Sequence, residues 1–569
     1  MKKKWLIHNH FNHEKVAQLK TSLNVSEVIA KLLSLRGIES FEDSKSFFRP
    51  NLDMLHDPFL MKGMQTAIDR INLAIKKNEK VLIFGDYDVD GTTAVALVYS
   101  FFKEYINNIR YYIPDRYSEG YGISFKSIDY AEENNYSLII ALDCGIKAND
   151  KIDYANAKQI DFIICDHHLP GEDIPNAIAV LDPKQKDCNY PFKELAGCGI
   201  GFKLAQAFCI SNNYEVNKIY NYLDLVVTSI AADIVPITGE NRVLAHFGLK
   251  QLNTNPRPGI KALLAFGKAE NKDLDINTLV FTIAPRINAA GRIEHGSKAV
   301  ELLISSTEDS VDFSAKINDT NLHRRDLDIS ITDEAIETLE LDPITPFKKS
   351  IVIYNPNWHK GVVGIVASRL IEKFYKPTIV LTLSNGVVSG SARSVKDFDV
   401  YTAIENCSHL LEQFGGHKFA AGLTMKPENV KAFIDAFENE VSRTITKDML
   451  VPTVEIDLEI KIDEIDDKLI RILKQFAPHG PHNMTPVFLS KGVLDTGFAR
   501  VVGQNHLKLE VYQPHTKLTK VEAIAFNKGD FLSFLQKQIP LDIVYKIKEN
   551  EFRGQVSIQL MIEEIRVSE

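Results

Sequence analysis

Three short apolar runs, each followed within two residues by an aspartate, constrain the fold of this chain more than any other feature. They are Val-Leu-Ile-Phe at 81–84, Leu-Ile-Ile-Ala-Leu at 138–142 and Phe-Ile-Ile-Cys at 162–165. Runs of this kind that alternate with helical patterns are typical of a parallel sheet in an α/β domain. The carboxyl ends of parallel strands meet at one edge of the sheet, where ligands bind. We therefore expect the polar residues behind these runs to converge in space.

The first of these strand ends carries Asp86, Asp88 and Asp90 in the stretch Gly-Asp-Tyr-Asp-Val-Asp-Gly at 85–91. Three carboxylates in five residues repel one another, and a divalent cation with oxygen ligands relieves that repulsion. A calcium-type loop or a solvated turn is the alternative interpretation. The buried strand directly upstream disfavours a surface turn and favours a metal site.

The other strand ends add Asp143 and the triplet Asp166, His167 and His168, and Asp233 is a single acid in an apolar run. Histidine beside carboxylates is a mixed nitrogen and oxygen donor set. Such a set suits manganese better than calcium, and it binds magnesium less readily than manganese. Each residue alone has a simpler explanation, such as a turn, a surface histidine pair or a helix-end acid. Their agreement at one sheet edge predicts a metal-binding site.

The remaining patterns indicate further domains. Residues 308–341 are charged, helix-prone and free of proline, which predicts long helices that bridge two domains. A second α/β unit begins near residue 351. After Pro452, apolar and charged residues alternate strictly at 454–462, and the alternation recurs at 507–511 and 556–560. This pattern predicts half-buried strands of a small antiparallel barrel or sandwich, for which an OB-like barrel is one topology.

Composition limits the class of protein. The 569 residues are 45% hydrophobic and 25% charged, which is ordinary for a globular protein. No run approaches the roughly 20 apolar residues that span a bilayer, and the six cysteines include no C-x-x-C pair. We expect a cytoplasmic protein with reduced cysteines and no membrane association. The net charge of −9 gives no global basic footprint, so any nucleic-acid site must be local.

The acidic and histidine segments resemble motifs I to IV of the DHH phosphoesterases in order and spacing, and motif I resembles the RecJ branch of that superfamily in particular. The segments are 86–91, 143–145, 166–168 and Asp233. The run Gly-Gly-His-Lys-Phe-Ala-Ala-Gly at 415–422 is similar to the glycine-rich signature of the DHHA1 substrate domain. Segments 114–122, 284–292 and 391–394 are also similar to RecJ sequences, so the resemblance spans roughly residues 50 to 500.

The resemblance implies an α/β fold class with a parallel-sheet DHH domain, a smaller α/β DHHA1 domain joined to it by long helices, and a C-terminal OB-like barrel. The boundaries we assign are an N-terminal segment packing on the catalytic core at 1–60, the DHH catalytic domain at 61–305, connecting helices at 306–342, the DHHA1 substrate-binding domain at 343–447 and a nucleic-acid-binding barrel at 448–569.

The resemblance also implies the site. Two ions, Mn²⁺ or Mg²⁺, would be held by Asp88, Asp90, Asp143, His167 and Asp233, with Asp86, Asp166 and His168 as further catalytic residues. The candidates for nucleic-acid binding are Arg116, Arg286, Ser391, Arg393, Gly416, His417 and Lys418. Guanidinium groups match phosphate oxygens in pairs, and glycine N–H groups can cradle a phosphate. Each arginine could instead be a structural ion-pair partner.

The activity implied is 5′→3′ exonucleolytic hydrolysis of single-stranded DNA to 5′-mononucleotides by a monomer in DNA repair and recombination. Single-strand-binding protein and a RecQ-type helicase are the partners implied beside the DNA. One alternative is a DHH phosphodiesterase of short oligoribonucleotides or cyclic dinucleotides, which needs little beyond two domains, whereas this chain adds about a hundred β-patterned residues. A binding protein that has lost catalysis is another alternative, but it should lack some of the acids.

Overall fold

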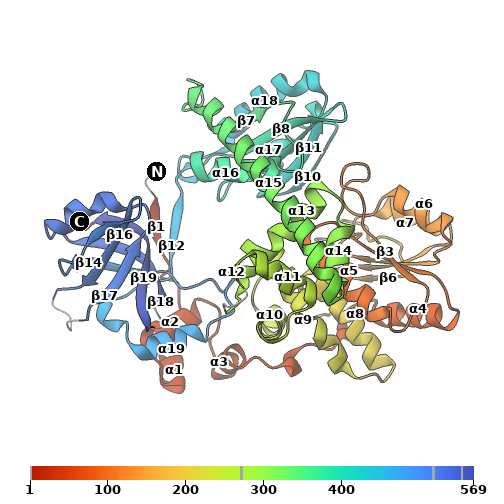
Figure 1. The fold of residues 1–569 in the computed structure, drawn as a ribbon, viewed down its shortest axis with the longest axis horizontal. Coiled ribbons are helices and arrows are strands. Elements are labelled where there is room, and N and C mark those ends of the chain that lie inside the picture. Colours follow the sequence, from red (N-terminus) through yellow and green to blue (C-terminus); the bar gives the residue numbers. More distant parts are fainter. Residues whose placement is uncertain (1–2, 270–272, 515–518, 553–554, 569) are drawn as a thin grey trace.

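The computed structural model describes residues 3–269, 273–514, 519–552 and 555–568. Two α/β domains lie side by side, joined by a long helix, and a β-barrel stands beside them (Figure 1). The expected combination of a parallel-sheet domain, a second α/β domain and an OB-type barrel is confirmed. The cysteines are all buried and unpaired. No helix among the described residues is long and apolar enough to cross a membrane.

The first α/β domain is built on a five-stranded parallel sheet in the order β3-β2-β4-β5-β6. The strands are β2 (Val81–Gly85), β3 (Ile109–Tyr112), β4 (Leu138–Leu142), β5 (Asp161–Cys165) and β6 (Ala179–Leu181). The register pairs Gly85 with Leu142 and Leu142 with Cys165, so the three strands that carry aspartates end side by side. The predicted parallel sheet therefore places the motif residues at one edge.

Helices cover both faces of this sheet, which explains why the central strands β2 and β4 are apolar and buried throughout. One face packs on α4 (Met64–Lys76), α5 (Val89–Phe102) and α8 (Gly197–Ser211), and α9 (Leu223–Ala232) packs behind α5 and α8. The other face packs on α6 (Phe125–Glu133) and α7 (Asn149–Ala157). The domain continues through α10 (Gly239–Thr254), α11 (Pro258–Phe266), α12 (Ile276–Thr278), a π-helical turn at Leu279–Ile283, α13 (Ala284–Ile293) and α14 (Ser297–Ile304).

The connection to the second domain is a single helix, α15 (Thr307–Leu341), where the sequence predicted more than one. Its 35 residues contain neither proline nor glycine, so nothing in the sequence breaks the backbone hydrogen bonds. Ser306 caps its first turn by accepting a hydrogen bond from the backbone N–H of Asp309. The helix runs diagonally from the second domain down to the first (Figure 1).

The second α/β domain has a mixed sheet in the order β10-β11-β9-β8-β7. Its strands are β7 (Ile351–Tyr354), β8 (Thr378–Ser384), β9 (Val387–Arg393), β10 (Gln413–His417) and β11 (Ala420–Met425), and its helices are α16 (Val363–Phe374), α17 (Val400–Glu405) and α18 (Val430–Thr444). Strand β10 pairs only with β11 and lies at the edge of the sheet. The glycine-rich segment forms this edge hairpin.

The C-terminal barrel orders its strands β13-β14-β18-β19-β17-β16-β15, and a further pairing of β14 with β16 closes it. The strands are β13 (Leu458–Glu459), β14 (Phe488–Asp495), β15 (Arg500–Val502), β16 (His506–Tyr512), β17 (Val521–Ala525), β18 (Leu541–Phe552) and β19 (Gln555–Val567). Two helices accompany them, α19 (Asp467–Lys474) and α20 (Leu532–Gln536). Most of the alternating sequence thus forms a barrel whose inward residues make its core. The barrel is mixed and not antiparallel as expected, because β13 and β14 pair in parallel, as do β17 and β19. The run at 454–462 is divided between a short strand outside the barrel, at Thr453–Ile456, and β13.

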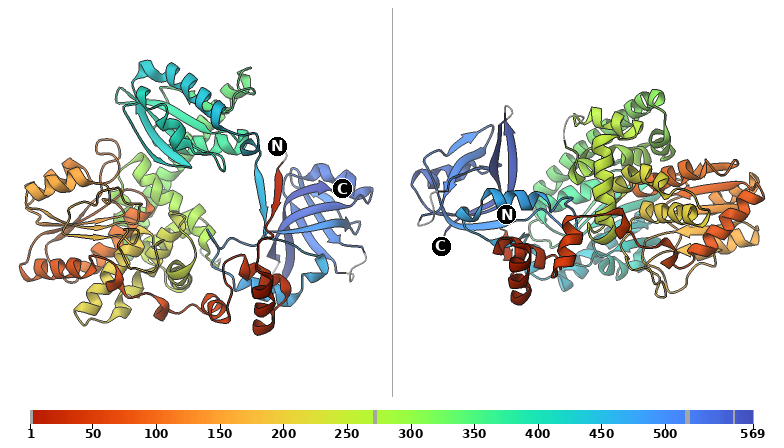
Figure 2. Two further views of the ribbon diagram at one scale, coloured as in Figure 1. Left: turned by 180° about the vertical axis from the view of Figure 1, so that it is seen from behind. Right: turned by 90° about the horizontal axis from the view of Figure 1, so that it is seen from below.

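The prediction that residues 1–60 pack on the catalytic core is wrong for most of that segment. Helices α1 (His13–Leu23) and α2 (Glu27–Ser34) share one hydrophobic core with the barrel, and α3 (Phe41–Phe48) adds its last residues to it (Figure 2). Strand β1 (Lys4–Ile7) pairs in parallel with β12 (Thr453–Ile456). Near the end of the segment, Leu52, Leu55 and Phe59 pack against the core of the first domain, and Phe47 and His56 contact its Arg242 and Glu240. Local apolar patterns show that a helix has a buried face but not which domain buries it.

Candidate active site

Three aspartates lie directly behind the parallel strands, and all are buried. Asp86 follows β2, Asp143 follows β4 and Asp166 follows β5. Asp143 adopts a left-handed backbone conformation with φ of 58°, which aspartate tolerates better than most residues and which turns the chain sharply at the strand end. The Nε2 atom of His167 lies 3.2 Å from Oδ1 of Asp143. The predicted convergence of strand ends is therefore present in the structure.

Asp90 joins the same cluster from the first turn of α5. Its carboxylate accepts hydrogen bonds from the N–H groups of Gly197 and Cys198, at 2.7 and 2.8 Å, and from the hydroxyl of Ser229 at 2.7 Å. The first two donors are unsatisfied N–H groups at the start of α8, which favour a negative charge. A Cβ atom at Gly197 would lie 2.7 Å from Cβ of Asp143, so the close approach of α8 requires glycine. Asp90 is thus held rigidly.

Asp233 and Asp88 complete the group of carboxylates. Asp233 ends α9, and its Oδ2 lies 3.6 Å from Nε2 of His167. The same nitrogen is 3.6 Å from Oδ2 of Asp90. Asp88 caps the N-terminus of α5 by accepting a hydrogen bond of 3.0 Å from the N–H of Gly91. Three segments far apart in the sequence, at the start of α5, the end of β4 and the end of α9, therefore deliver acids to one imidazole.

The crowding of acids raises their pKa values. Burial raises the pKa of Asp143 well above its ordinary value, and the charges of Asp90 and Asp88 add to the effect. The pKa of Asp233 rises to about 8 through burial and the same two neighbours. Burial, with a neighbouring carboxylate, also raises the pKa values of Asp86 and Asp88. The cluster is therefore an unfavourable concentration of negative charge that a cation would neutralise.

Unpartnered buried atoms also fit a metal. Oδ2 of Asp86 and both ring nitrogens of His167 lack hydrogen-bond partners although they are buried. Burial lowers the pKa of His167, so its imidazole is held in the neutral form that binds metals. Two groups of donor atoms lie within 4.8 Å of one another, namely Asp90, His167 and Asp233, and Asp143, His167 and His168. Carboxylates with an imidazole suit Mn²⁺, and a site of mostly oxygen donors also accepts Mg²⁺.

Asp166 has a different role from the other acids, because its carboxylate is fully engaged. It accepts hydrogen bonds from the N–H of Ile146 at 2.9 Å, from the N–H of His167 at 2.7 Å, and from the N–H and Nδ1 of His168 at 3.1 and 2.8 Å. Burial alone would raise its pKa, but these hydrogen bonds outweigh burial and hold the pKa of Asp166 at about 2. Asp166 therefore orients the two histidines.

His168 is held as a cation beside this cluster. Burial lowers its pKa, but the hydrogen bond that its Nδ1 donates to Asp166, with the negative charge of that carboxylate, outweighs burial and raises the pKa of His168 to about 9. Its ring is 45% exposed, so the second ring nitrogen can reach a bound molecule. A protonated imidazole next to the proposed metal ligands can donate a hydrogen bond to a phosphoryl oxygen.

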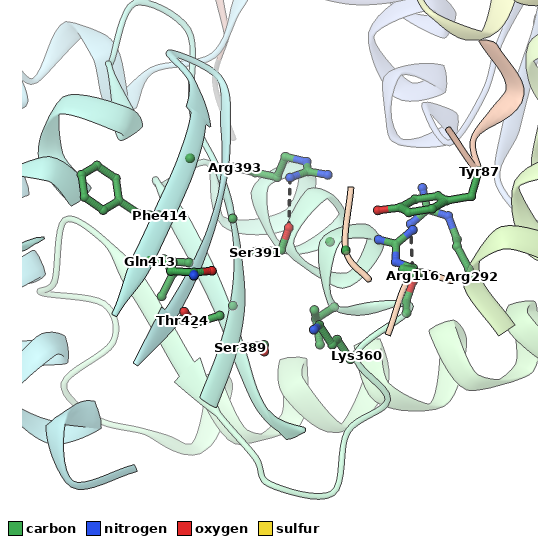
Figure 3. A pocket seen from close by; sticks show the side chains of 18 residues that line it. Tyr87, Arg116, Arg292, Lys360, Ser389, Ser391, Arg393, Gln413, Phe414 and Thr424 are labelled. Atoms are coloured by element: carbon green, nitrogen blue, oxygen red, sulfur yellow. Dashed lines mark hydrogen bonds between the residues drawn. The ribbon is translucent and has the colours of Figure 1, made fainter. Parts of the chain in front are cut away.

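A cavity of about 480 Å³ lies between the two α/β domains and is lined by cations. Arg116 and Arg292 approach it from the first domain, and Lys360 and Arg393 from the second (Figure 3). None of the four forms an ion pair with any residue that the structure describes. Burial and the nearby Arg116 lower the pKa of Arg292 to about 10. Four cations without acidic partners make this cavity a binding site for an anion.

The cavity and the carboxylate cluster share one loop. Tyr87, between Asp86 and Asp88, lines the cavity, and the guanidinium carbon of Arg116 lies 4.9 Å from the centre of its ring. The hydroxyl of Tyr117 donates a hydrogen bond of 2.5 Å to the carbonyl oxygen of Arg292, which ties the two arginine segments together. The anion site is therefore adjacent to the candidate metal site.

Comparisons with known proteins agree with this geometry. Family models match the chain in three places, as the N-terminal domain of the DHH family at 80–230, the DHHA1 domain at 348–443 and the RecJ OB domain at 456–564. The single-stranded-DNA-specific exonuclease RecJ of Bacillus subtilis is 36% identical over 564 residues, covering 98% of this chain and 70% of that protein. RecJ of Escherichia coli is 31% identical, covering 95% of each chain. The chain belongs to the RecJ family.

Solved RecJ structures share its fold. The crystal structure of Thermus thermophilus RecJ in complex with Mn²⁺ matches 100% of this chain and 80% of that chain with a TM-score of 0.85, at 24% identity. A structure titled exonuclease RecJ bound to manganese matches 69% of this chain and 97% of that chain with a TM-score of 0.60, at 28% identity. The RecJ arrangement of domains is thus reproduced along the whole chain.

Some of the residues that the RecJ resemblance nominated for nucleic-acid binding lie elsewhere. Arg116, Ser391 and Arg393 do line the cavity. Arg286 does not, because its guanidinium donates hydrogen bonds of 3.2 Å to Oδ1 of Asn318 and 2.6 Å to the carbonyl oxygen of Thr282. Residues six positions apart on α13 point in different directions, so Arg292, and not Arg286, lines this cavity, and a role of Arg286 in nucleic-acid binding stays a prediction.

The edge hairpin also contributes differently from the prediction. Gly416, His417 and Lys418 do not line the cavity, whereas Gln413, Phe414 and Gly415 do. Gly416 has φ of 146°, and a Cβ atom there would lie 2.3 Å from the carbonyl oxygen of Ala420, so this glycine serves the hairpin itself. Lys360 was missed because it follows a short loop with no recognisable motif. A Cβ atom placed at Gly415 would meet no atom within 4 Å, so the backbone of this residue is open to a ligand.

Proposed function

We propose that the chain is a metal-dependent exonuclease that hydrolyses single-stranded DNA from the 5′ end and releases 5′-mononucleotides. The observation that carries this proposal is that a cavity lined by four unpaired cations lies beside a buried cluster of carboxylates and histidine, with Tyr87 of the loop Asp86–Asp88 in its lining. A phosphate in the cavity would place the neighbouring phosphodiester at the cluster. The RecJ relatives are named as single-stranded-DNA-specific exonucleases, which supports the same activity.

The proposed ligands for the two divalent ions are Asp88, Asp90, Asp143, His167 and Asp233, with Asp86 close by. Bound metal ions would lower the pKa of a water molecule and neutralise the charge that develops on the phosphate oxygens. Thermus thermophilus RecJ has been crystallised with Mn²⁺ and with Mg²⁺, so we propose that either ion supports this enzyme.

Side chains of the protein would bind and orient the DNA strand. Arg116, Arg292 and Arg393 would bind the terminal phosphate and orient the strand, since guanidinium groups match phosphate oxygens in pairs. His168, protonated at neutral pH, would donate a hydrogen bond to the phosphate at the scissile bond. Asp166 would keep that imidazole in its orientation and in its charged form.

The direction of digestion would follow from the number of positive charges that line the cavity. A terminal phosphate carries up to about two negative charges and an internal diester carries one, so four cations favour the end of the strand. We place the 5′ end in the cavity, and each round of hydrolysis would then remove one nucleotide. The proposal includes a monomeric enzyme in the cytoplasm that acts in DNA repair and recombination, with single-strand-binding protein and a RecQ-type helicase as the partners that present the strand.

The barrel is proposed to bind the part of the strand farther from the cleavage site. Phe526 is 48% exposed with His506 at its edge, and Arg500 stacks 4.2 Å from the ring centre of the exposed Phe498. Aromatic rings beside cations are the elements with which OB folds stack and track single strands. Phe488, by contrast, is fully buried in the barrel core and cannot stack on a base.

Substituting both Phe526 and Arg500 by alanine is expected to raise the apparent Kd for a long single strand by about tenfold, because stacking is worth about 1–3 kcal/mol per base. Cleavage of a trinucleotide should change little. Binding measured at several salt concentrations should also give a shallower salt dependence, since one phosphate contact is lost. The substitution is cleaner than deletion of the barrel, on which α1 and α2 pack. Equal losses on long and short substrates would contradict a binding role for this face.

The experiment that tests the function itself is a digest of single strands and duplexes labelled at either end, with Mg²⁺ or Mn²⁺ added to metal-free protein. We expect single strands alone to be degraded, with a label at the 5′ end released as mononucleotide in the first turnover. Early release of a 3′ label would reverse the proposed polarity. Equal digestion of RNA strands of a few nucleotides, with slow digestion of long DNA, would favour the oligoribonucleotide alternative.

A further inference from the structure

Arg242, on α10 of the first domain, makes an unusual set of contacts far from the cavity. Its guanidinium donates five hydrogen bonds, and every acceptor is a backbone carbonyl oxygen. One acceptor is Phe47, at the end of the N-terminal helices. The other four are the consecutive residues 475–478, in the linker between α19 and β14 of the barrel. The side chain is buried, and no carboxylate of the described residues pairs with it.

These contacts engage every N–H donor of the Arg242 guanidinium. A guanidinium has five N–H donors in a planar fork, so the five carbonyl oxygens satisfy it completely. Its carbon also lies 3.7 Å from the ring centre of Phe47, and that ring packs edge-on against Phe476 at 5.3 Å. Lysine has one flexible ammonium and could not reproduce this set of contacts. Arg242 therefore fixes two chain segments to α10 at once.

These segments belong to the barrel and not to the first domain. The hydrophobic core of the barrel includes α1 and α2 and reaches Phe47 and Phe48, and it shares no residue with the core of the first domain. Two cavities, of about 310 and 410 Å³, flank Arg242 on either side. The barrel thus meets the first domain through a polar junction with space around it, in which Arg242 provides most of the hydrogen bonds.

Neighbouring contacts extend the junction toward the metal site. Asn483 donates hydrogen bonds to the carbonyl oxygens of Phe476 and Pro478, and Arg36 donates one to Oδ1 of Asn483. The N–H of Ile237 donates a bond of 2.8 Å to the carbonyl oxygen of Pro481. Ile237 lies four residues after Asp233. The linker is therefore attached both to α10 and to the segment that follows a proposed metal ligand.

The barrel's second attachment is weaker. Near the other α/β domain it consists of the short β1–β12 pair, an ion pair of 3.9 Å between Lys4 and Asp448, and an ion pair between Lys396 and Glu455. Both side chains of the latter pair are about half exposed, and exposed ion pairs contribute little to stability. Figure 2 shows the barrel beside the other domains, connected through β12 on one side and through the linker on the other. The Arg242 junction is the attachment with buried, complete hydrogen bonding.

We propose that Arg242 is a positioning residue, which fixes the barrel relative to the metal-binding cluster so that one long strand can contact both. This inference rests on the proposed function, because it takes the barrel as the second binding site for the strand. Two sites on one rigid frame bind a long ligand more tightly than either site alone, and the gain falls when their separation varies. A short strand, which reaches only the cavity, gains nothing from the junction.

The test compares two strand lengths. Arg242→Lys is expected to raise the apparent KM for a strand of about 30 nucleotides, longer than the roughly 4–16 nucleotides that one OB fold covers, by about tenfold. The kcat on that strand, and kcat/KM on a trinucleotide, should stay within about twofold of the unsubstituted enzyme. Phe47→Leu, which keeps the carbonyl acceptor and removes the ring, should give a smaller shift in the same direction. Arg49→Lys is the matched control, because Arg49 is exposed and bonds to the same linker only through the side chain of Gln475.

A second measurement follows the position of the barrel without any DNA. All six native cysteines are buried, so dyes can be attached selectively to cysteines introduced at the exposed positions Lys76 on the first domain and Lys537 on the barrel. Energy transfer should report one narrow distribution of distances in the unsubstituted protein and in Arg49→Lys, and a broader one in Arg242→Lys.

The outcomes separate the inference from the function on which it rests. An unchanged distribution in a folded Arg242→Lys protein would overturn the positioning role. An equal loss of kcat/KM on the long and short strands would also overturn it. Such a result would show that the junction supports the position of Asp233 and not that of the barrel. A broader distribution with an unchanged KM for long strands would support the positioning role and refute strand binding by the barrel.

Discussion

Replacing Asp143 by asparagine is expected to abolish hydrolysis of single-stranded DNA while the protein stays folded. Asparagine keeps the shape of the side chain and tolerates the left-handed backbone conformation at this position. It removes a charge that lies within 3.2 Å of His167 and is crowded by other buried carboxylates. Loss of a metal ligand should cost several kcal/mol of transition-state stabilisation, which corresponds to a rate more than about 100-fold lower.

Two measurements check this expectation. Single-turnover rates with saturating Mn²⁺ give the catalytic loss, and thermal unfolding of metal-free protein gives the stability. We expect metal-free Asp143→Asn protein to unfold at the same temperature as the unsubstituted protein or at a higher one, because the substitution relieves repulsion in the empty cluster. Added Mn²⁺ should stabilise the variant less than the unsubstituted protein. A variant that keeps more than about a tenth of the activity would exclude Asp143 as a ligand.

Removing the guanidinium of Arg292 is expected to erase a preference for strands that begin with a 5′-phosphate. The unsubstituted enzyme should cleave 5′-phosphorylated strands faster than 5′-hydroxyl strands, because the cavity holds four cations without acidic partners. A hydrogen bond to a charged group contributes about 1.5–3 kcal/mol, so Arg292→Ala or Arg116→Ala should reduce the preference by about tenfold or more. Metal binding should be unaffected, since neither residue lies among the carboxylates.

Arg286→Gln is the matched control for this second prediction. Arg286 lies on the same helix as Arg292, but its guanidinium is bonded to Thr282 and Asn318 away from the cavity. The quantity to compare is the ratio of initial rates on the two kinds of strand, which does not depend on the fraction of active enzyme. An undiminished ratio in both Arg116→Ala and Arg292→Ala would show that the cavity does not bind the terminal phosphate of the strand.

The sequence predicts the centre of the site well because strand ends follow from local patterns. A buried parallel strand is recognisable in five residues, and the geometry of a parallel sheet then brings Asp86, Asp143 and Asp166 to one edge. What the sequence could not distinguish is the part each acid plays. Asp166 is occupied by hydrogen bonds from the turn at 167–168 and from the N–H of Ile146, whereas Asp86 keeps an unpartnered oxygen. That difference depends on the exact turn geometry and on a neighbouring segment, which local patterns do not encode.

Contacts between domains were harder to predict than contacts within them. The choice between Arg286 and Arg292 depends on which face of α13 meets the second domain, and the motif contains both residues. The N-terminal helices have apolar faces that would suit either the catalytic core or the barrel, and they pack on the barrel. Arg242 has no distinguishing sequence context, because its acceptors are backbone carbonyl oxygens that every residue supplies. Such partners depend on tertiary structure that local patterns do not encode.

The continuous α15 has a consequence for how this enzyme can change during evolution. A helix of 35 residues at about 1.5 Å per residue is about 50 Å long, and each residue turns the chain by about 100°. Inserting or deleting one residue would therefore shift the second domain and also rotate it, carrying Lys360 and Arg393 away from Arg116 and Arg292. Substitutions on the exposed face of the helix change neither the distance between the two domains nor their rotation about the helix axis. The length of α15 should thus be far less free to vary than its composition.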